Sequence, residues 1–98
     1  MLQANNLTLL TGTTELLITP SNARLVKIVN QNATTGTVTI REAAAIGGGS
    51  TAKFTISAAD LTAGGKDFSA NGVRFQGGLT IQLSVAGDQI GIIWAPNL

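Results

Sequence analysis

The chain of 98 residues contains no histidine, no cysteine and no tyrosine. These side chains, together with clustered carboxylates, carry out most general acid–base and nucleophilic catalysis and hold most transition metals. The five acidic residues that remain are scattered along the sequence, without the spacing of a cation-binding loop or of a catalytic carboxylate pair. We therefore predict that the protein is not an enzyme and that it has no metal site and no cofactor.

Charge of either sign is scarce. Charged residues make up 11% of the chain, against roughly 25% in an average domain. The six basic residues fall in different segments with no aromatic interleaving, which argues against nucleic-acid binding. Two pairs of adjacent residues carry opposite charges: Arg41-Glu42 and Lys66-Asp67. Neighbours along a strand face opposite sides of it, so the members of each pair do not form a local ion pair, and we expect them to be solvated. Uncharged polar residues must cover much of the surface, and such a surface resists association less than a charged one.

Long apolar runs and disulfides are also missing. No stretch approaches the ~18 consecutive apolar residues of a membrane span, and no basic region follows Met1, so we expect neither a membrane partner nor a secretory signal. Without cysteine, the core must be stable alone or with the help of other subunits. The length is that of one domain.

What the sequence does contain is alternation of apolar and polar residues. It is strict in residues 37–42 (TVTIRE), 53–57 (KFTIS) and 79–85 (LTIQLSV), and weaker near residues 6–10, 14–19, 72–76 and 89–94. Residues 24–30 (RLVKIVN) are apolar on both faces apart from Lys27, which predicts a central or interface-facing strand. Turn residues separate these segments, and only residues 57–64 indicate a helical turn. We predict an all-β fold: an antiparallel, jelly-roll-like β-sandwich of about eight short strands with at most one short helical turn.

Two local features have alternative interpretations. Trp94 shares a strand face with Ile90 and Ile92, which favours a place in the core, although a lone tryptophan on a β-rich protein is alternatively a platform for a sugar. Residues 47–50 (GGGS) lack the lysine and the strand-to-helix setting of a phosphate-binding loop. We predict an ordinary loop there.

The N-terminal segment is rich in leucine. Residues 1–12 are predicted to form an N-terminal arm or first strand, and residues 13–98 a single β-sandwich domain. A free apolar end would promote aggregation, so the segment must either supply the first strand of its own sandwich or reach onto a neighbouring subunit. The candidate partner-binding residues are its four leucines, Leu2, Leu7, Leu9 and Leu10.

Four segments together resemble the small virion proteins of tailed bacteriophages: residues 14–32 (TELLITPSNARLVKIVNQN), 37–43 (TVTIREA), 57–61 (SAADL) and 72–96 (GVRFQGGLTIQLSVAGDQIGIIWAP). Such proteins carry no catalytic motif, so the resemblance transfers no functional residue.

The resemblance implies a β-sandwich capsid cement or decoration protein that binds and stabilises the phage head shell. Its partner would be the major capsid protein or another virion protein, it would form a homo-oligomer with a trimer favoured, and it would reside in the virion after synthesis in the host cytoplasm. The alternative is a head or tail accessory protein, or a fibre-type module, that binds a glycan or a host receptor.

Overall fold

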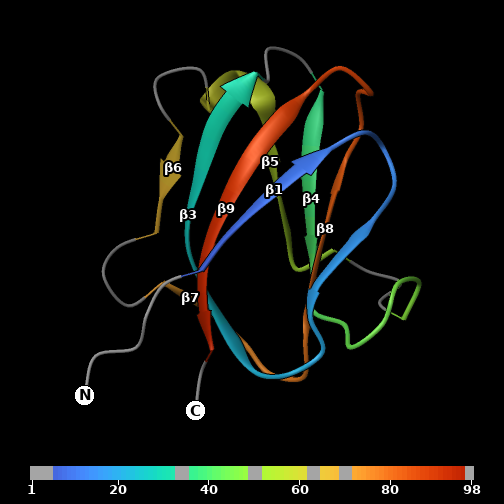
Figure 1. Cartoon of the computed structure of the whole chain (residues 1–98), viewed down its shortest axis with the longest axis vertical. Helices are drawn as coiled ribbons and strands as arrows, with labels where there is room; N and C mark the ends of the chain where they lie inside the picture. The colour runs from blue at the N-terminus through green and yellow to red at the C-terminus, as the bar shows by residue number, and fades with distance from the viewer. Residues whose placement is uncertain (1–5, 33–35, 49–51, 62–64, 69–71, 97–98) are drawn as a thin grey trace.

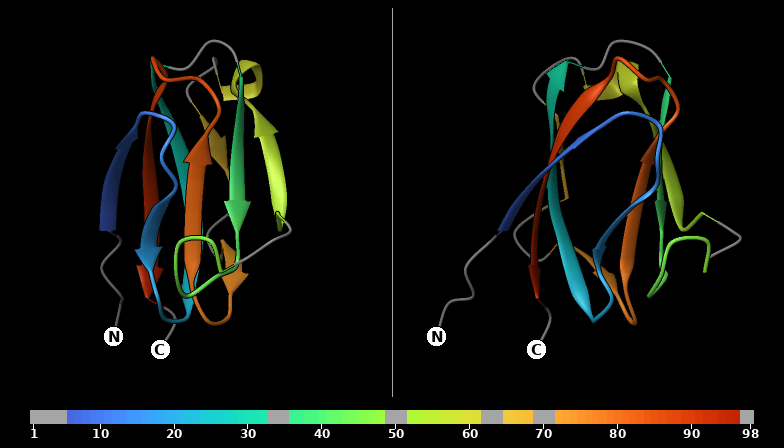
Figure 2. Two further views of the ribbon diagram at one scale, coloured as in Figure 1. Left: turned by 90° about the vertical axis from the view of Figure 1, so that its right-hand side faces the viewer. Right: turned by 45° about the vertical axis from the view of Figure 1, so that its right-hand side comes forward.

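Two antiparallel sheets packed face to face make up the protein in the computed structural model (Figure 1). The structure describes residues 6–32, 36–48, 52–61, 65–68 and 72–96. The chain passes repeatedly from one sheet to the other, as Figure 2 shows from two further sides. The predicted all-β sandwich is confirmed.

Each sheet is assembled from strands far apart in the sequence. Sheet A has the order β1 (Asn6–Thr11), β9 (Gln89–Pro96), β3 (Ala23–Asn32) and β6 (Lys66–Asp67), and β7 (Val73–Phe75) also pairs with β3. Sheet B has the order β2 (Leu16–Thr19), β8 (Leu79–Leu83), β4 (Thr37–Arg41) and β5 (Phe54–Ser57). A four-residue 3-10 helix, η1 (Ala58–Leu61), follows β5.

The strand order is that of a jelly roll. Strands β6 and β7 run beside different parts of β3 and act as two pieces of one interrupted strand. The first half of the chain then pairs with the second half in reverse order: β1 with β9, β2 with β8, β3 with β7 and β6, and β4 with β5. A long hairpin folded over into two sheets has this arrangement, so the predicted jelly-roll-like topology is also confirmed.

The core lies between the sheets and is formed by the inward positions of the alternating strands. Its completely buried members include Val38 and Ile40 of β4, Ile81 of β8, and Ile90 and Ile92 of β9. Strand β3 is central, as its apolar sequence predicted, with β9 on one side and β6 and β7 on the other. A register shift between Leu25 and Lys27 adds a residue to β3, as in a β-bulge.

Two details differ from the sequence prediction or refine it. The described part contains nine strands instead of about eight, because Lys66 and Asp67, which lie outside the alternating segments, form the short strand β6. Two residues are too few to show alternation. The predicted helical turn is present as η1, and no helix within the described ranges is long and apolar enough to cross a bilayer.

Candidate interaction surface

Residues 6–11 of the N-terminal segment form β1, which pairs with β9 of the same chain along its whole length. The register runs from Asn6 opposite Trp94 to Thr11 opposite Gln89. Strand β1 stands at the end of sheet A. The segment is therefore the first strand of its own sandwich over these residues, while Leu2 lies outside the described residues.

The period of two along β1 divides the predicted partner-binding leucines between two environments. Leu10 points inward, is 5% exposed and belongs to the core. Leu7 and Leu9 point outward, and each is 61% exposed. Leu10 thus stabilises its own subunit and presents no exposed side chain to a partner, whereas Leu7 and Leu9 remain candidates.

Neighbouring strands extend the apolar surface beyond the two leucines. Leu7 is paired with Ile93, and Leu9 with Gly91, which is in turn opposite Val29 of β3. Because paired residues share a sheet face, these five residues form one outward surface, which we call the leucine face. A Cβ atom built on Gly91 would lie 3.2 Å from Leu7 Cδ1 and 3.6 Å from both Leu9 Cδ2 and Gln31 Nε2, so the two leucine side chains and the Gln31 amide converge over this glycine.

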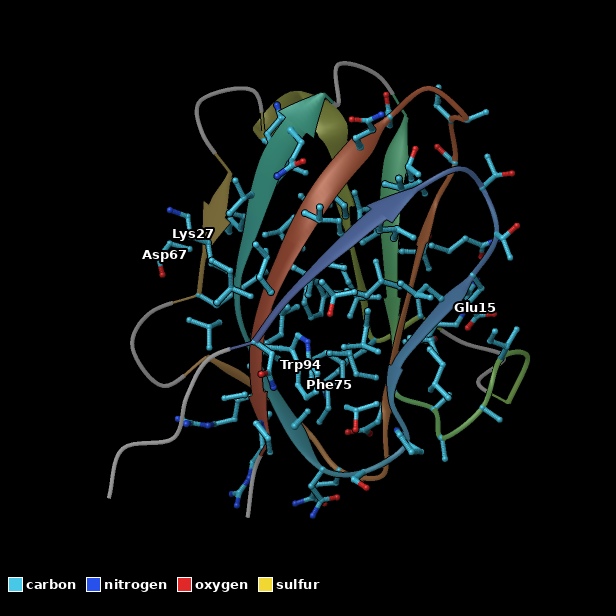
Figure 3. The ribbon with its side chains drawn as sticks, viewed as in Figure 1. Glu15, Lys27, Asp67, Phe75 and Trp94 are labelled. Carbon is cyan, nitrogen blue, oxygen red and sulfur yellow. The ribbon has the colours of Figure 1, made fainter. Side chains whose placement is uncertain are left out.

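The leucine face carries no charge. Lys27 borders it on β3, opposite Ile93, and Asp67 of β6 is in register with Lys27. Figure 3 shows Lys27 and Asp67 side by side on one flank of the molecule, away from Glu15. Beside Leu9, a hollow of about 230 Å³ extends toward Gln31 and Gln89. The surface around Leu9 therefore combines apolar side chains with neutral amides.

The outer face of sheet B has a different character, because polar side chains there bind one another. Arg41 Nη1 lies 4.0 Å from Glu15 Oε2 and donates a hydrogen bond of 3.0 Å to Gln82 Oε1. Gln82 Nε2 donates to the Thr13 carbonyl, and Gly47 N–H donates to Glu15 Oε1. The side chains of Arg41 and Glu15 are only 22% and 11% exposed. The expectation that Arg41 is solvated was wrong, because the fold brings it close to Glu15, which lies 26 positions earlier in the chain.

Trp94 combines parts of both interpretations offered for it. The side chain is half-buried and packs against the core, and its Nε1–H donates a 3.1 Å hydrogen bond to Thr8 Oγ1. The residue also lines an open hollow of about 580 Å³ with Pro20, Asn22 and Pro96. Residues 20–22 were predicted only as a turn, because nothing in their sequence indicates that a tryptophan from the other end of the chain lies beside them.

Neither a metal centre nor a relative supplies a function. Within the described ranges, no three histidine, cysteine or acidic side chains gather where they would hold a metal ion. Comparisons with protein-family models, with curated proteins and with solved structures found no match for this chain. The chain's own surfaces are therefore the only described features that point to a function.

Proposed function

We propose that this chain is a non-enzymatic structural protein of a virus particle, a capsid cement or decoration protein that binds the major capsid protein or another virion protein. The observation that carries the proposal is the outward exposure of Leu7 and Leu9 on a surface continued by Val29 and Ile93. Removing a large aliphatic side chain from water contributes about 1.5–3 kcal/mol when burial is complete. An apolar surface of contiguous residues is characteristic of a protein–protein contact.

The position of the leucine face at the end of a sheet adds to this support. Natural proteins protect edge strands with lysine, proline, bulges or a covering segment. Strand β1 contains no charged residue and no proline, and its pairing with β9 is continuous from Asn6 to Thr11 without a register shift. A regular, neutral edge next to an apolar face suits addition of a second chain, and closed symmetry would then give a homo-oligomer, for which we propose a trimer.

A protein that only has to bury surface across the joints of a shell needs no catalytic group, and repeated copies multiply a weak contact into strong attachment. Jelly rolls are found in viral capsid and lectin domains. Because a fold alone does not determine function, the topology is compatible support, and the leucine face remains the main argument.

The first test is the molar mass in solution, measured by light scattering on a sizing column for the wild type and for a Leu7→Ser/Leu9→Ser variant. We expect a closed oligomer for the wild type and a folded monomer for the variant. Ile46→Ser is the matched control, because Ile46 is 58% exposed but lies in the loop after β4. Dissociation by the control, or an unchanged mass in the leucine variant, would contradict assembly through this face.

The second test concerns the particle. Virus particles purified on a density gradient from the source culture are expected to contain the protein at a regular copy number, measured by quantitative mass spectrometry. Particles stripped of the protein should bind added wild type and the Ile46→Ser control but not the leucine variant. Complete absence of the protein from the particles would refute the cement role even if the protein forms an oligomer.

A second candidate function is the fibre-type or accessory module that binds a glycan or receptor. The observation that favours it is the hollow beside Trp94, which lies apart from the leucine face.

A further inference from the structure

We propose that the hollow beside Trp94 is a binding site for a neutral pyranose sugar. The hollow measures about 580 Å³ and is open to solvent. It lies where the turn between β2 and β3 meets the end of β9, and Figure 3 shows Trp94 in that half of the molecule. Its walls combine one aromatic ring, two proline rings and three uncharged polar side chains: Trp94, Pro20, Pro96, Thr19, Ser21 and Asn22.

Hydrogen bonds within the protein hold several of these groups in place. Trp94 Nε1–H donates a 3.1 Å hydrogen bond to Thr8 Oγ1. Thr19 Oγ1 accepts from Ser21 N–H at 3.2 Å, and Asn22 Oδ1 accepts from Gly77 N–H at 2.8 Å. The proline rings have little freedom of their own. A site whose side chains are already ordered loses less entropy when a ligand binds.

The pattern of donors fits a polyhydroxylated ligand. Because Asn22 Oδ1 is occupied by Gly77 N–H, the amide orientation is defined and the NH₂ group is the part left to donate toward a ligand. The hydroxyls of Thr19 and Ser21 can donate or accept. A pyranose presents C–H groups on one face and hydroxyls at its rim, so the Trp94 ring would contact the C–H face while the polar groups bind the rim.

The absence of charge from the lining decides between ligand classes. The described residues that line the hollow include no acidic or basic side chain, so none of them can form an ion pair with a phosphate, a carboxylate or an ammonium group. Proline-rich peptides are recognised in grooves lined by several aromatics, whereas this hollow has a single one. A neutral sugar is the ligand that uses both the tryptophan and the uncharged polar groups.

The chain's single tryptophan makes the test direct. Trp94 fluorescence is titrated with the methyl pyranosides of glucose, galactose and mannose and with N-acetylglucosamine, with glycerol as the control for added hydroxyl groups. We expect a saturable change for at least one sugar, at a Kd on the order of 1 mM, and none for glycerol. In NMR spectra of the wild type, the shifts should centre on the Trp94 indole N–H and the Asn22 side-chain amide.

Two variants of Asn22 test whether its side-chain NH₂ group donates a hydrogen bond to the sugar. Asn22→Asp keeps the acceptor for Gly77 N–H but removes the NH₂ group, and it should weaken binding about three- to tenfold. Asn22→Ala removes both groups and serves as a second variant, with its folding checked by thermal unfolding. Leu7→Ser/Leu9→Ser should bind the sugar as the wild type does, so failure of the assembly proposal and failure of this one are distinguishable.

Three results would overturn the sugar site. The first is the lack of any saturable response to the four sugars, and the second is a set of NMR shifts centred away from Trp94. The third is a folded Asn22→Asp variant with unchanged affinity. Saturable binding of a polyproline peptide in place of every sugar would likewise overturn the choice of ligand.

Discussion

The two outer faces of the sandwich differ in how their side chains are satisfied. On sheet B, Arg41 lies 4.0 Å from Glu15 and donates a hydrogen bond to Gln82. The loop after β4 lies against this side of the molecule (Figure 2), and its Gly47 N–H donates to Glu15. On sheet A, Leu7 and Leu9 are each 61% exposed, and the leucine face that they share has no ion pair and no cover among the described residues.

The difference shows which outer face has its side-chain contacts within the subunit and which one would gain contacts from a partner. Arg41, Gln82 and Glu15 Oε1 of sheet B lose little by staying within their own subunit, because their hydrogen bonds are made there. Apolar side chains on sheet A gain free energy only when water is removed from them. Binding of another molecule would therefore gain more free energy at the leucine face than at the outer face of sheet B.

The largest expected effect comes from disturbing the cover of sheet B at Gly78. This glycine has φ +124°, and a Cβ atom added to it would collide with the carbonyl oxygen of Ala43 in the covering loop. Gly78→Ala should lower the free energy of unfolding by about 3 kcal/mol or more, since both backbone strain and a backbone collision oppose the methyl group. Chemical denaturation measures the loss.

Gly87→Ala is the control for that substitution. A Cβ atom at Gly87 meets nothing within 4 Å, and its φ lies outside the left-handed range. Its stability should stay within about 0.5 kcal/mol of the wild type. Equal losses at Gly78 and Gly87 would show that the close approach to Ala43 is not what constrains the loop.

Strand β1 allows the two environments to be compared one residue apart. Leu10→Ala should cost about 2–3 kcal/mol of unfolding free energy, because it leaves a cavity in the core. Leu9→Ala should cost less than about 0.5 kcal/mol, because its side chain is mostly in water already. Denaturation of both variants as monomers, with the mass checked by light scattering, measures the contrast.

A large loss of monomer stability from Leu9→Ala would place Leu9 in the fold and remove it from the proposed binding surface. A small loss from Leu10→Ala would contradict the inward orientation of its side chain.

A smaller effect is expected from the polar cluster of sheet B. Glu15→Ala removes the partner of Arg41 and the acceptor of Gly47 N–H, and should cost about 1–2 kcal/mol. Glu15→Gln retains a hydrogen-bond acceptor of similar shape and should cost less. If urea denaturation shows no loss in either variant, the cluster does not stabilise the face, and the contrast with sheet A would then concern polarity alone.

The strands were predictable from the sequence because alternation is a local property. Residues 37–41, 54–57 and 79–83 are strands with Val38, Ile56 and Ile81 inward, as period two requires. The central place of β3 followed from its apolar residues on both faces. The short strand β6 was missed because Lys66 and Asp67 become a strand only through their pairing with β3.

The candidate surfaces were predictable only in part. Leucine content indicated the N-terminal segment, and alternation along a strand separates Leu7 and Leu9 from Leu10. The sequence alone did not show which of the two faces is inward, since that depends on the strand's place beside β9. Val29 and Ile93 joined the leucine face through the same register. The hollow beside Trp94 had no sequence signal, because Pro20 and Asn22 lie more than 70 residues from Trp94 along the chain.

The sequence by itself determined an all-β chain with a sparsely charged surface and without histidine or cysteine, because composition and the alternation of apolar and polar residues are local properties that do not depend on which strands pair. The tertiary structure decided which distant strands became neighbours, and so which leucines stayed in water, which charges found partners and where Trp94 met the turn at Pro20. Those outcomes depend on register and on the packing of one sheet over the other, and both are set by contacts between residues far apart in the chain.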